Sequence, residues 1–194
     1  TNKVISIIDS DLSGHADYGQ GQVFSFGAVL TDLAGNKQEG SPSSDTLQVD
    51  TVVPRGGLSY TVGGVAVSRV KQGVDVLVTA TMSEAIANAP VLQLSASGSN
   101  TISAVDMTRD STTSYSYLWR VGAGDGTTSF VLSLGRDLAG NVAAATPTTG
   151  VGIVVDNTVP SDFTLGVVTA VGGVVESGYW NGSNSSLTVR VPIA

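Results

Sequence analysis

The chain has 194 residues, no cysteine and one histidine (His15), and nine basic against sixteen acidic residues give a net charge of −7. The lack of cysteine excludes disulfides and a cysteine nucleophile, and with a single histidine it excludes a zinc site built from His and Cys. The acidic balance has the wrong sign for binding nucleic acid or an anionic membrane surface. No apolar run approaches the ~18 residues that a transmembrane helix needs.

The composition favours β-structure throughout. Valine and threonine make up 49 of the 194 residues, and glycine adds 24. β-Branched side chains are stiff and fit a pleated surface, while glycine supplies turns. We therefore expect an all-β protein.

The N-terminal part begins with predicted strands at 4–8 and 22–30, separated by the sequence DSDLSGHADYGQ at 9–20. This segment places oxygen-bearing side chains at positions 1, 3, 5 and 9 of a loop, with glycine at position 6, as in the first half of an EF-hand-type calcium loop. Position 12 is Gln20 instead of the bidentate glutamate. Two interpretations stay open, a bound cation or a polar turn. The candidate ligands are Asp9, Asp11, Ser13 and Asp17.

Two sequence motifs recur at nearly the same spacing. TDLAGN at 31–36 returns as RDLAGN at 136–141, and VDTVVP at 49–54 returns as VDNTVP at 155–160. The first pair lies 105 residues apart and the second 106, and VGGV at 62–65 has a weaker echo at 171–174. Such a period indicates tandem repeats. The chain is then one complete repeat, 52–157, between the C-terminal part of a repeat, 1–51, and the N-terminal part of the next, 158–194.

The complete repeat contains seven short apolar or alternating runs separated by turn residues. They are 58–62, 74–81, 91–96, 102–107, 115–121, 129–134 and 151–155. This number and spacing favour a Greek-key β-sandwich of immunoglobulin (Ig) type. The only helical signal is one turn at 83–89, before Pro90.

A family resemblance follows from these motifs. TDLAGN with VDTVVP, TATMSEAI at 79–86 and YLWRVGAGDGT at 117–127 resemble the tandem Ig-like (Big-type) repeats of large bacterial cell-surface and adhesin proteins. Those repeats have an FSE-type phrase after the second strand, where this chain has Met82 in place of phenylalanine. The resemblance covers residues 20–194 and implies an extracellular, non-enzymatic module whose partners are neighbouring repeats.

In an Ig-type sandwich, the start of the first strand and the loops after the second, fourth and sixth strands share one end. Candidate metal ligands lie at each of these places: Asp50, Glu84, Asp110, Asp137 and Asn141. Gathered carboxylates repel one another, and calcium, which prefers oxygen ligands, removes that cost. We expect either a calcium site that stiffens the junction between repeats or, as the alternative, Asp and Asn side chains that only cap the turn.

Aromatic residues in the run 115–121 alternate onto one strand face, where they either fill the core or offer a platform for sugar stacking. Trp180 lies in a stretch rich in glycine and asparagine and is expected to be exposed.

A Ser-His-Asp triad would have to use His15, which has no nucleophile motif near it, so we expect no enzymatic activity. The predicted function is a structural spacer of a surface protein. The alternatives are direct adhesion to a glycan or protein, and a filament subunit whose partial repeats are completed by another chain.

Overall fold

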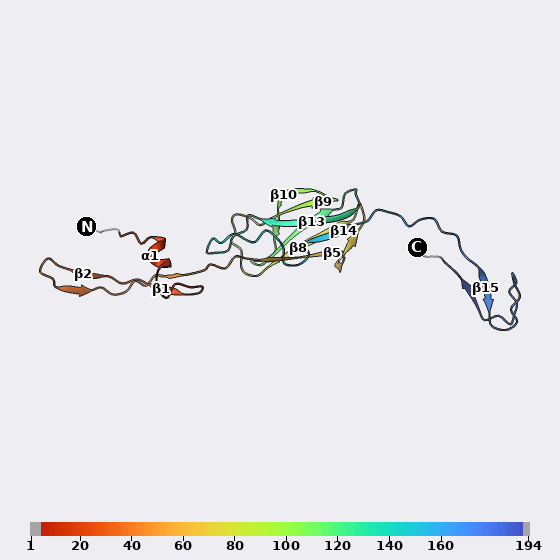
Figure 1. The fold of residues 1–194 in the computed structure, drawn as a ribbon, viewed down its shortest axis with the longest axis horizontal. Coiled ribbons are helices and arrows are strands. Elements are labelled where there is room, and N and C mark those ends of the chain that lie inside the picture. Colours follow the sequence, from red (N-terminus) through yellow and green to blue (C-terminus); the bar gives the residue numbers. More distant parts are fainter. Residues whose placement is uncertain (1–4, 192–194) are drawn as a thin grey trace. The chain divides into compact units, whose positions relative to one another are not determined.

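The computed structural model describes residues 5–191, and nearly all of its regular secondary structure consists of strands (Figure 1). The chain divides into two compact units, residues 1–157 and 158–194. Within the described residues no helix is long and apolar enough to cross a bilayer. The prediction of an all-β protein is confirmed.

The N-terminal part of the first unit contains one short helix and two small two-stranded sheets. Its elements are α1 (Asp9–Ser13), β1 (Val23–Ser25), β2 (Val29–Thr31), β3 (Lys37–Glu39) and β4 (Thr46–Gln48). β1 pairs with β4 and β2 pairs with β3, both antiparallel.

Two expectations for this part are corrected. Residues 5–8 of the predicted strand 4–8 are not a strand, and Val4 lies outside the described residues. The predicted strand 22–30 is divided into β1 and β2. The backbone between them accepts hydrogen bonds from the loop between β3 and β4: the Gly40 amide donates to the Ala28 carbonyl and the Ser43 amide to the Phe26 carbonyl.

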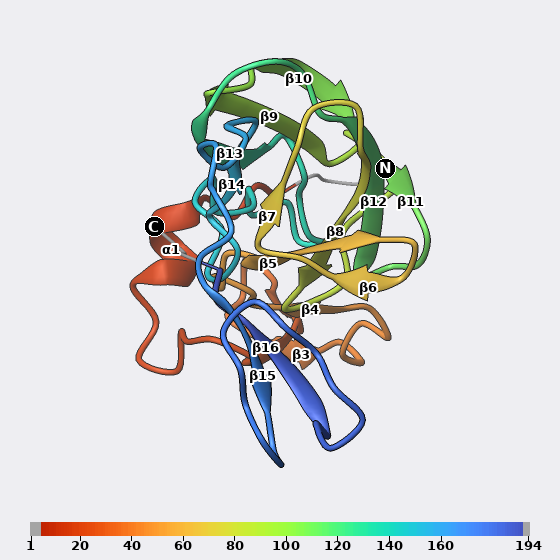
Figure 2. The same cartoon turned by 90° about the vertical axis from the view of Figure 1, so that its right-hand side faces the viewer.

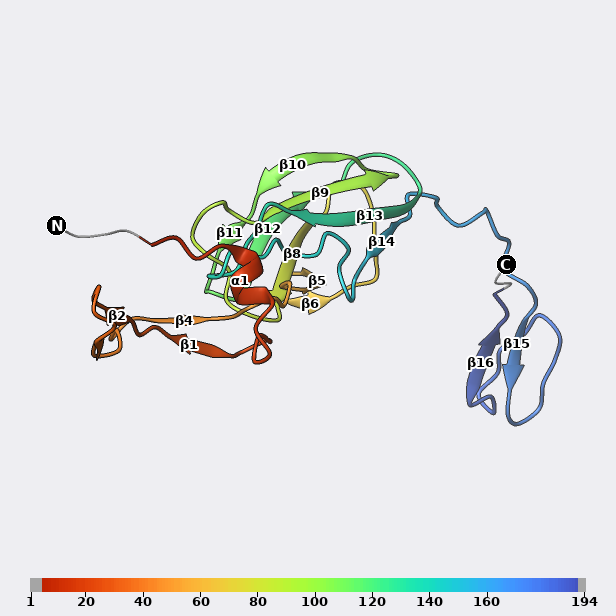
Figure 3. The same ribbon diagram turned by 60° about the vertical axis from the view of Figure 1, so that its left-hand side comes forward.

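Residues 56–155 form two five-stranded sheets. Their elements are β5 (Gly56–Val62), β6 (Val65–Ala66), β7 (Arg69–Val70), β8 (Asp75–Met82), β9 (Gln93–Gly98), β10 (Ile102–Asp106), β11 (Thr108–Arg109), β12 (Ser114–Arg120), β13 (Gly126–Ser133) and β14 (Gly152–Val155). One sheet has the order β10-β9-β13-β14-β7 and the other β11-β12-β8-β5-β6. Figure 3 shows β9, β10 and β13 on one side of this sandwich and β5, β6 and β8 on the other.

The strands alternate between a buried and an outer face, and the two buried faces share one core. In β8, Val76, Val78, Ala80 and Met82 are buried while the residues between them are not. Phe130 of β13 lies at the centre, with its ring centroid 5.4 Å from that of Tyr60 and 5.5 Å from that of Trp119. Period-two burial of this kind fixes the register of each strand, since a slip of one residue would expose the whole set.

The aromatic run 115–121 belongs to this core. Tyr115 and Trp119 are buried, and Tyr117 packs against the core from a partly buried position. Of the two interpretations of this run, core filling is therefore the one that the structure supports.

The helical turn expected at 83–89 is wrong. Ile86 is buried and forms an isolated antiparallel bridge with Asp137, and its amide donates to the Thr112 carbonyl. Because these backbone partners come from distant loops, the segment cannot close the i to i−4 bonds of a helix.

The second unit contains one antiparallel hairpin, β15 (Val168–Val171) with β16 (Ser186–Val189) (Figure 2). All eight strand residues except Ala170 are exposed. In the central sandwich, by contrast, the antiparallel pair β5 and β8 has one face covered by the opposite sheet.

We expect Phe130→Ala to lower the free energy of unfolding by about 3–5 kcal/mol, because it removes a large side chain from the centre of a packed core. Leu118→Ala, at a position on β12 that is 63% exposed, should change it by less than about 0.5 kcal/mol. Urea unfolding followed by tryptophan fluorescence measures both. Equal effects of the two substitutions would contradict the assignment of this core.

Candidate functional site

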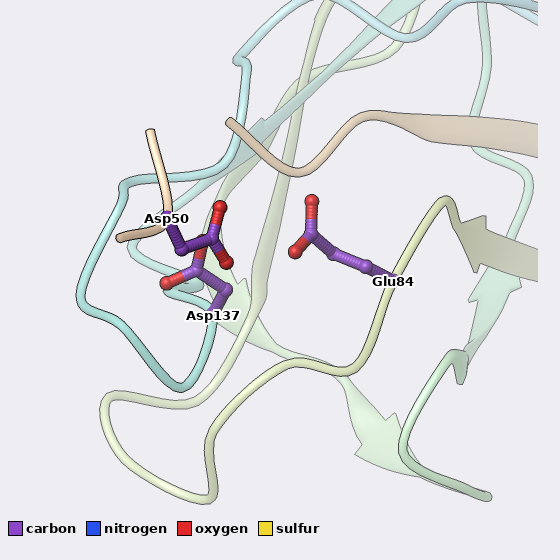
Figure 4. Close-up of side chains that lie close together, drawn as sticks. All are labelled: Asp50, Glu84 and Asp137. Carbon is purple, nitrogen blue, oxygen red and sulfur yellow. The ribbon is translucent and has the colours of Figure 1, made fainter. Parts of the chain in front are cut away.

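A group of three carboxylates lies where the central sandwich begins. Asp50 precedes the first linker, Glu84 follows β8, and Asp137 starts the turn after β13. One oxygen atom from each lies within 4.8 Å of one from each of the others. Figure 4 shows the carboxylate of Glu84 reaching toward those of Asp50 and Asp137.

The turn 137–141 is held by the carboxylate of Asp137 itself. One oxygen accepts the amides of Gly140 (2.6 Å) and Asn141 (2.8 Å), and the other accepts the side-chain amide of Asn141 (2.8 Å). Residue 137 is only 3% exposed. Burial raises the pKa of Asp137, but these hydrogen bonds to its charged form outweigh it, so that the pKa lies below the usual range.

Asn141 connects this turn to the preceding linker. Its side-chain nitrogen, besides contacting Asp137, donates to the backbone carbonyl of Asp50 at 3.1 Å. Asp137 therefore caps its own turn, which was the alternative interpretation of this motif. The hydrogen bond from Asn141 also fixes the position of Asp50 beside the turn.

Glu84 is the carboxylate of the group that has the least favourable surroundings. Its pKa is raised above the ordinary value, first by burial and then by the charges of Asp137 and Asp50. None of the ion pairs found among residues 5–191 includes a member of the group. Two charges 4.8 Å apart repel by roughly 1 kcal/mol in water and several at an effective dielectric near 20, so the group is a region of concentrated negative charge.

From the sequence, Gln20 was considered only as position 12 of a calcium loop; in the structure it clamps the linker at this site. Its side-chain nitrogen donates to the Asp50 carboxylate (2.9 Å), and its oxygen accepts the Thr51 amide (2.5 Å) and hydroxyl (3.0 Å). The equivalent residue 105 positions later, Asp125, accepts the amide of Asn157 at 2.5 Å. The signal was in the sequence: GQG at 19–21 corresponds to GDG at 124–126.

Asp110, the fifth predicted ligand of this end, is not part of the group. Its carboxylate accepts the Ser116 hydroxyl at 3.0 Å, across the turn between β11 and β12. The topology therefore brings four of the five residues together and leaves Asp110 beside its own turn.

The second predicted cation site does not have the expected loop conformation. Residues 9–13 form helix α1, in which residues two apart, such as Asp11 and Ser13, differ in direction by about 200°, so they do not have the arrangement of an EF-hand-type loop. Asp11 instead accepts the amide of Ile8 at 3.1 Å, and Asp17 lies 3.7 Å from His15. Asp9 belongs to α1, but its side chain lies outside the described part. The expected loop conformation is therefore wrong, whereas cation binding by these residues stays a prediction.

The comparisons with known proteins give no family for this chain. A scan against protein-family models finds no match, and a search of curated proteins finds none either.

We expect Asp137→Ala to lower the free energy of unfolding by about 2–4 kcal/mol, because it removes a buried carboxylate that caps three donors. The matched control is Asp32→Ala, which removes the same cap from the exposed turn 32–36 and should have a clearly smaller effect. Thermal unfolding of both variants checks this. A larger loss from Asp32→Ala would contradict it.

Glu84→Gln should stabilise the protein at neutral pH. Because the pKa of Glu84 is raised in the folded state, folding favours its protonated form, so its contribution to stability falls as pH rises through the ordinary glutamate range. Glutamine carries no charge, so the variant avoids the unfavourable charge of Glu84 in the folded state. Its gain in free energy of unfolding over wild type should disappear at acidic pH, where Glu84 is protonated in both the folded and the unfolded state. Urea unfolding across pH measures this gain, with Glu39→Gln, at an exposed position on β3, as the matched control.

Proposed function

We propose that the chain is a non-catalytic spacer from a repetitive extracellular protein of a bacterial surface, built of tandem Ig-like Greek-key sandwiches that calcium stiffens at the junctions. The observation that carries the proposal is the repetition of one local structure. Asp32 accepts the amides of Ala34 (2.9 Å) and Asn36 (2.8 Å) and the side chain of Asn36 (2.8 Å). Asp137 likewise accepts two backbone amides, those of Gly140 and Asn141, and the side chain of Asn141.

The Ig-like part of the proposal is supported by strand order. Lettered A to G in chain order, with β6, β7 and β10 left aside, the remaining seven strands are β5, β8, β9, β11, β12, β13 and β14. One sheet then contains D-E-B-A and the other C-F-G. This order resembles the two sheets of a constant-type Ig domain, with β10 added beside strand C.

The spacer part is supported by how the first junction is built. The linker at 51–55 is short, its proline is buried, and the Pro54 carbonyl accepts the amide of Ala144 at 2.8 Å. Gln20 and Asn141 hold the residues just before and after the start of this linker. A short linker that is bonded on both sides resists bending, which is the property that a projecting rod needs.

Calcium is proposed from the chemistry of the donors. Asp50, Glu84 and Asp137 offer only oxygen atoms, and their charges are not balanced by an ion pair among the described residues. Calcium binds such hard ligands, and extracellular modules do so at about 10⁻⁴–10⁻³ M. A bound cation would supply the positive charge that this group lacks. Because Asp50 lies just before the linker and Glu84 and Asp137 belong to the sandwich, the same cation would connect the two.

Calcium should raise the unfolding temperature of the wild-type chain relative to a chelator. At tenfold excess over Kd, the gain in free energy of unfolding is about 1.4 kcal/mol by mass action. Glu84→Gln should abolish this gain, whereas Asp110→Asn should keep it. Small-angle scattering should show a narrower range of end-to-end lengths with calcium. An unchanged unfolding temperature would contradict the proposed calcium site, and an unchanged scattering profile would contradict the proposed stiffening of the junction.

A second candidate function is direct adhesion to a glycan, favoured by the surface of the second unit. Tyr179 is 75% and Trp180 57% exposed. They border a hollow of about 290 Å³ together with Val168, Ala170, Gly178 and Leu187. Exposed aromatic rings stack on sugars, so glycan-array binding that is lost in Trp180→Ala would favour adhesion over the spacer.

A further inference from the structure

The last strand of the central sandwich is held by a segment that comes soon after its first strand. β14 pairs in parallel with β7, the short strand that follows the β5–β6 pair. The Val154 amide donates to the Ser68 carbonyl at 3.2 Å, and the Asp156 amide donates to the Val70 carbonyl at 2.9 Å. These backbone bonds join the two parts of the sandwich that lie farthest apart in its sequence.

A side chain extends this pairing beyond the end of β14. The Asn157 side-chain oxygen accepts the Gln72 amide at 2.6 Å, and its side-chain nitrogen donates to the Gly124 carbonyl at 2.5 Å. Residues 68, 70 and 72 are thus bonded in turn to residues 154, 156 and 157. The segment 68–72 therefore follows the chain to the point where it leaves the sandwich.

The beginning of the sandwich is bonded in the same parallel sense. Residues 54–58 lie beside residues 144–149, which precede β14, and the residue numbers rise together in the two segments. Three amides donate to carbonyls across this pair, at 2.8–3.0 Å: Ala144 to Pro54, Thr148 to Gly56, and Leu58 to Thr149. Two stretches of parallel pairing therefore connect the start of the sandwich with its end.

This pairing determines how the sandwich responds to tension along the chain. β5 begins at the end of the sandwich where the linker enters, and β14 runs to the opposite end (Figure 1). Tension therefore pulls the first segment back toward its N-terminal end and the last segment toward its C-terminal end. Parallel segments pulled in these directions can only slide past one another, so that all the evenly spaced bonds between them are stretched together.

One backbone hydrogen bond contributes little net stability by itself. If the bonds were opened one after another, each would resist tension alone. Because the parallel arrangement stretches them at the same time, their resistance adds up.

We propose that the central sandwich carries tension along the chain, and that the hydrogen bonds joining residues 54–58 to 144–149 and residues 68–72 to 154–157 set the force at which it unfolds. We call these bonds the tension clamp. The inference rests on the proposed spacer function, since tension reaches the sandwich only through its linkers, and it adds mechanical resistance to that function. None of the three carboxylates of the candidate calcium group takes part in the clamp.

Single-molecule force spectroscopy of the full chain in a chelator tests the clamp, since no native cysteine competes with introduced attachment points. Handles on Val53→Cys and Val159→Cys, two exposed positions, pull along the chain direction. Handles on Thr127→Cys and Val159→Cys start near adjacent ends of β13 and β14, because Thr127 faces Val154, and open the bonds of β14 one after another. We expect a several-fold higher unfolding force with the first pair of handles. Equal forces would overturn the clamp.

Variants test the named bonds in the first pulling direction. Val154→Pro removes the amide that bonds Ser68, and it should lower the unfolding force by more than Val105→Pro, at another half-buried valine, on the edge strand β10. Urea unfolding of both variants allows the forces to be compared at equal loss of stability. If Val154→Pro does not fold, Asn157→Ala serves instead, because it keeps the backbone bonds and removes the bond to Gln72. A force loss no larger than that of Val105→Pro would overturn the clamp.

The position of the handles separates this inference from the proposed function. Val53 follows Asp50, so the junction and its candidate calcium group are not stretched as a unit. Equal forces in the two directions overturn the clamp and leave the calcium-stiffened spacer standing. Forces that depend on direction, together with a scattering profile that calcium does not change, support the clamp and overturn the stiffened junction.

Discussion

The hydrogen bonding of one aspartate to the turn that it begins is the interaction on which the junction depends. Asp137 accepts two backbone amides and one side-chain amide, which keeps it ionised although it is buried. The same bonds orient Asn141, whose remaining hydrogen reaches the Asp50 carbonyl. A local turn thereby becomes the point at which the linker is attached to the sandwich, and the negative charge of Glu84 is brought close to two others.

This arrangement explains why one motif can be both a structural cap and part of a candidate ligand group. Capping uses the lone pairs of Asp137 that face its own turn, while the cluster depends on which neighbours the fold places beside it. At Asp32 the cap is complete and exposed, and at Asp137 the same cap is surrounded by Asp50 and Glu84. The difference between the two copies comes from their surroundings, and the motif itself is unchanged.

Sequence reasoning succeeded where the relevant interactions are local. All seven predicted strands of the central repeat appear, because alternation of apolar residues and turn glycines acts within a few positions; the 74–81 run, for instance, becomes β8 at Asp75–Met82. It failed at 9–13, where a cation-loop pattern forms a helical turn, and at 83–89, where a helical signal gave way to backbone bonds from distant loops. The role of Gln20 at the linker was missed because its partner, Asp50, lies thirty residues away.

The sequence by itself determined the all-β class, the period of about 105 residues and the positions of the capped turns, since these follow from composition, repetition and short-range hydrogen bonds. Only the tertiary structure decided that Asp50, Glu84 and Asp137 approach within 4.8 Å while Asp110 stays with Ser116. The reason is that a shared end of a sandwich brings loops near one another, but the distance between two side chains depends on the path of each loop. That path is set by packing between segments far apart in the chain.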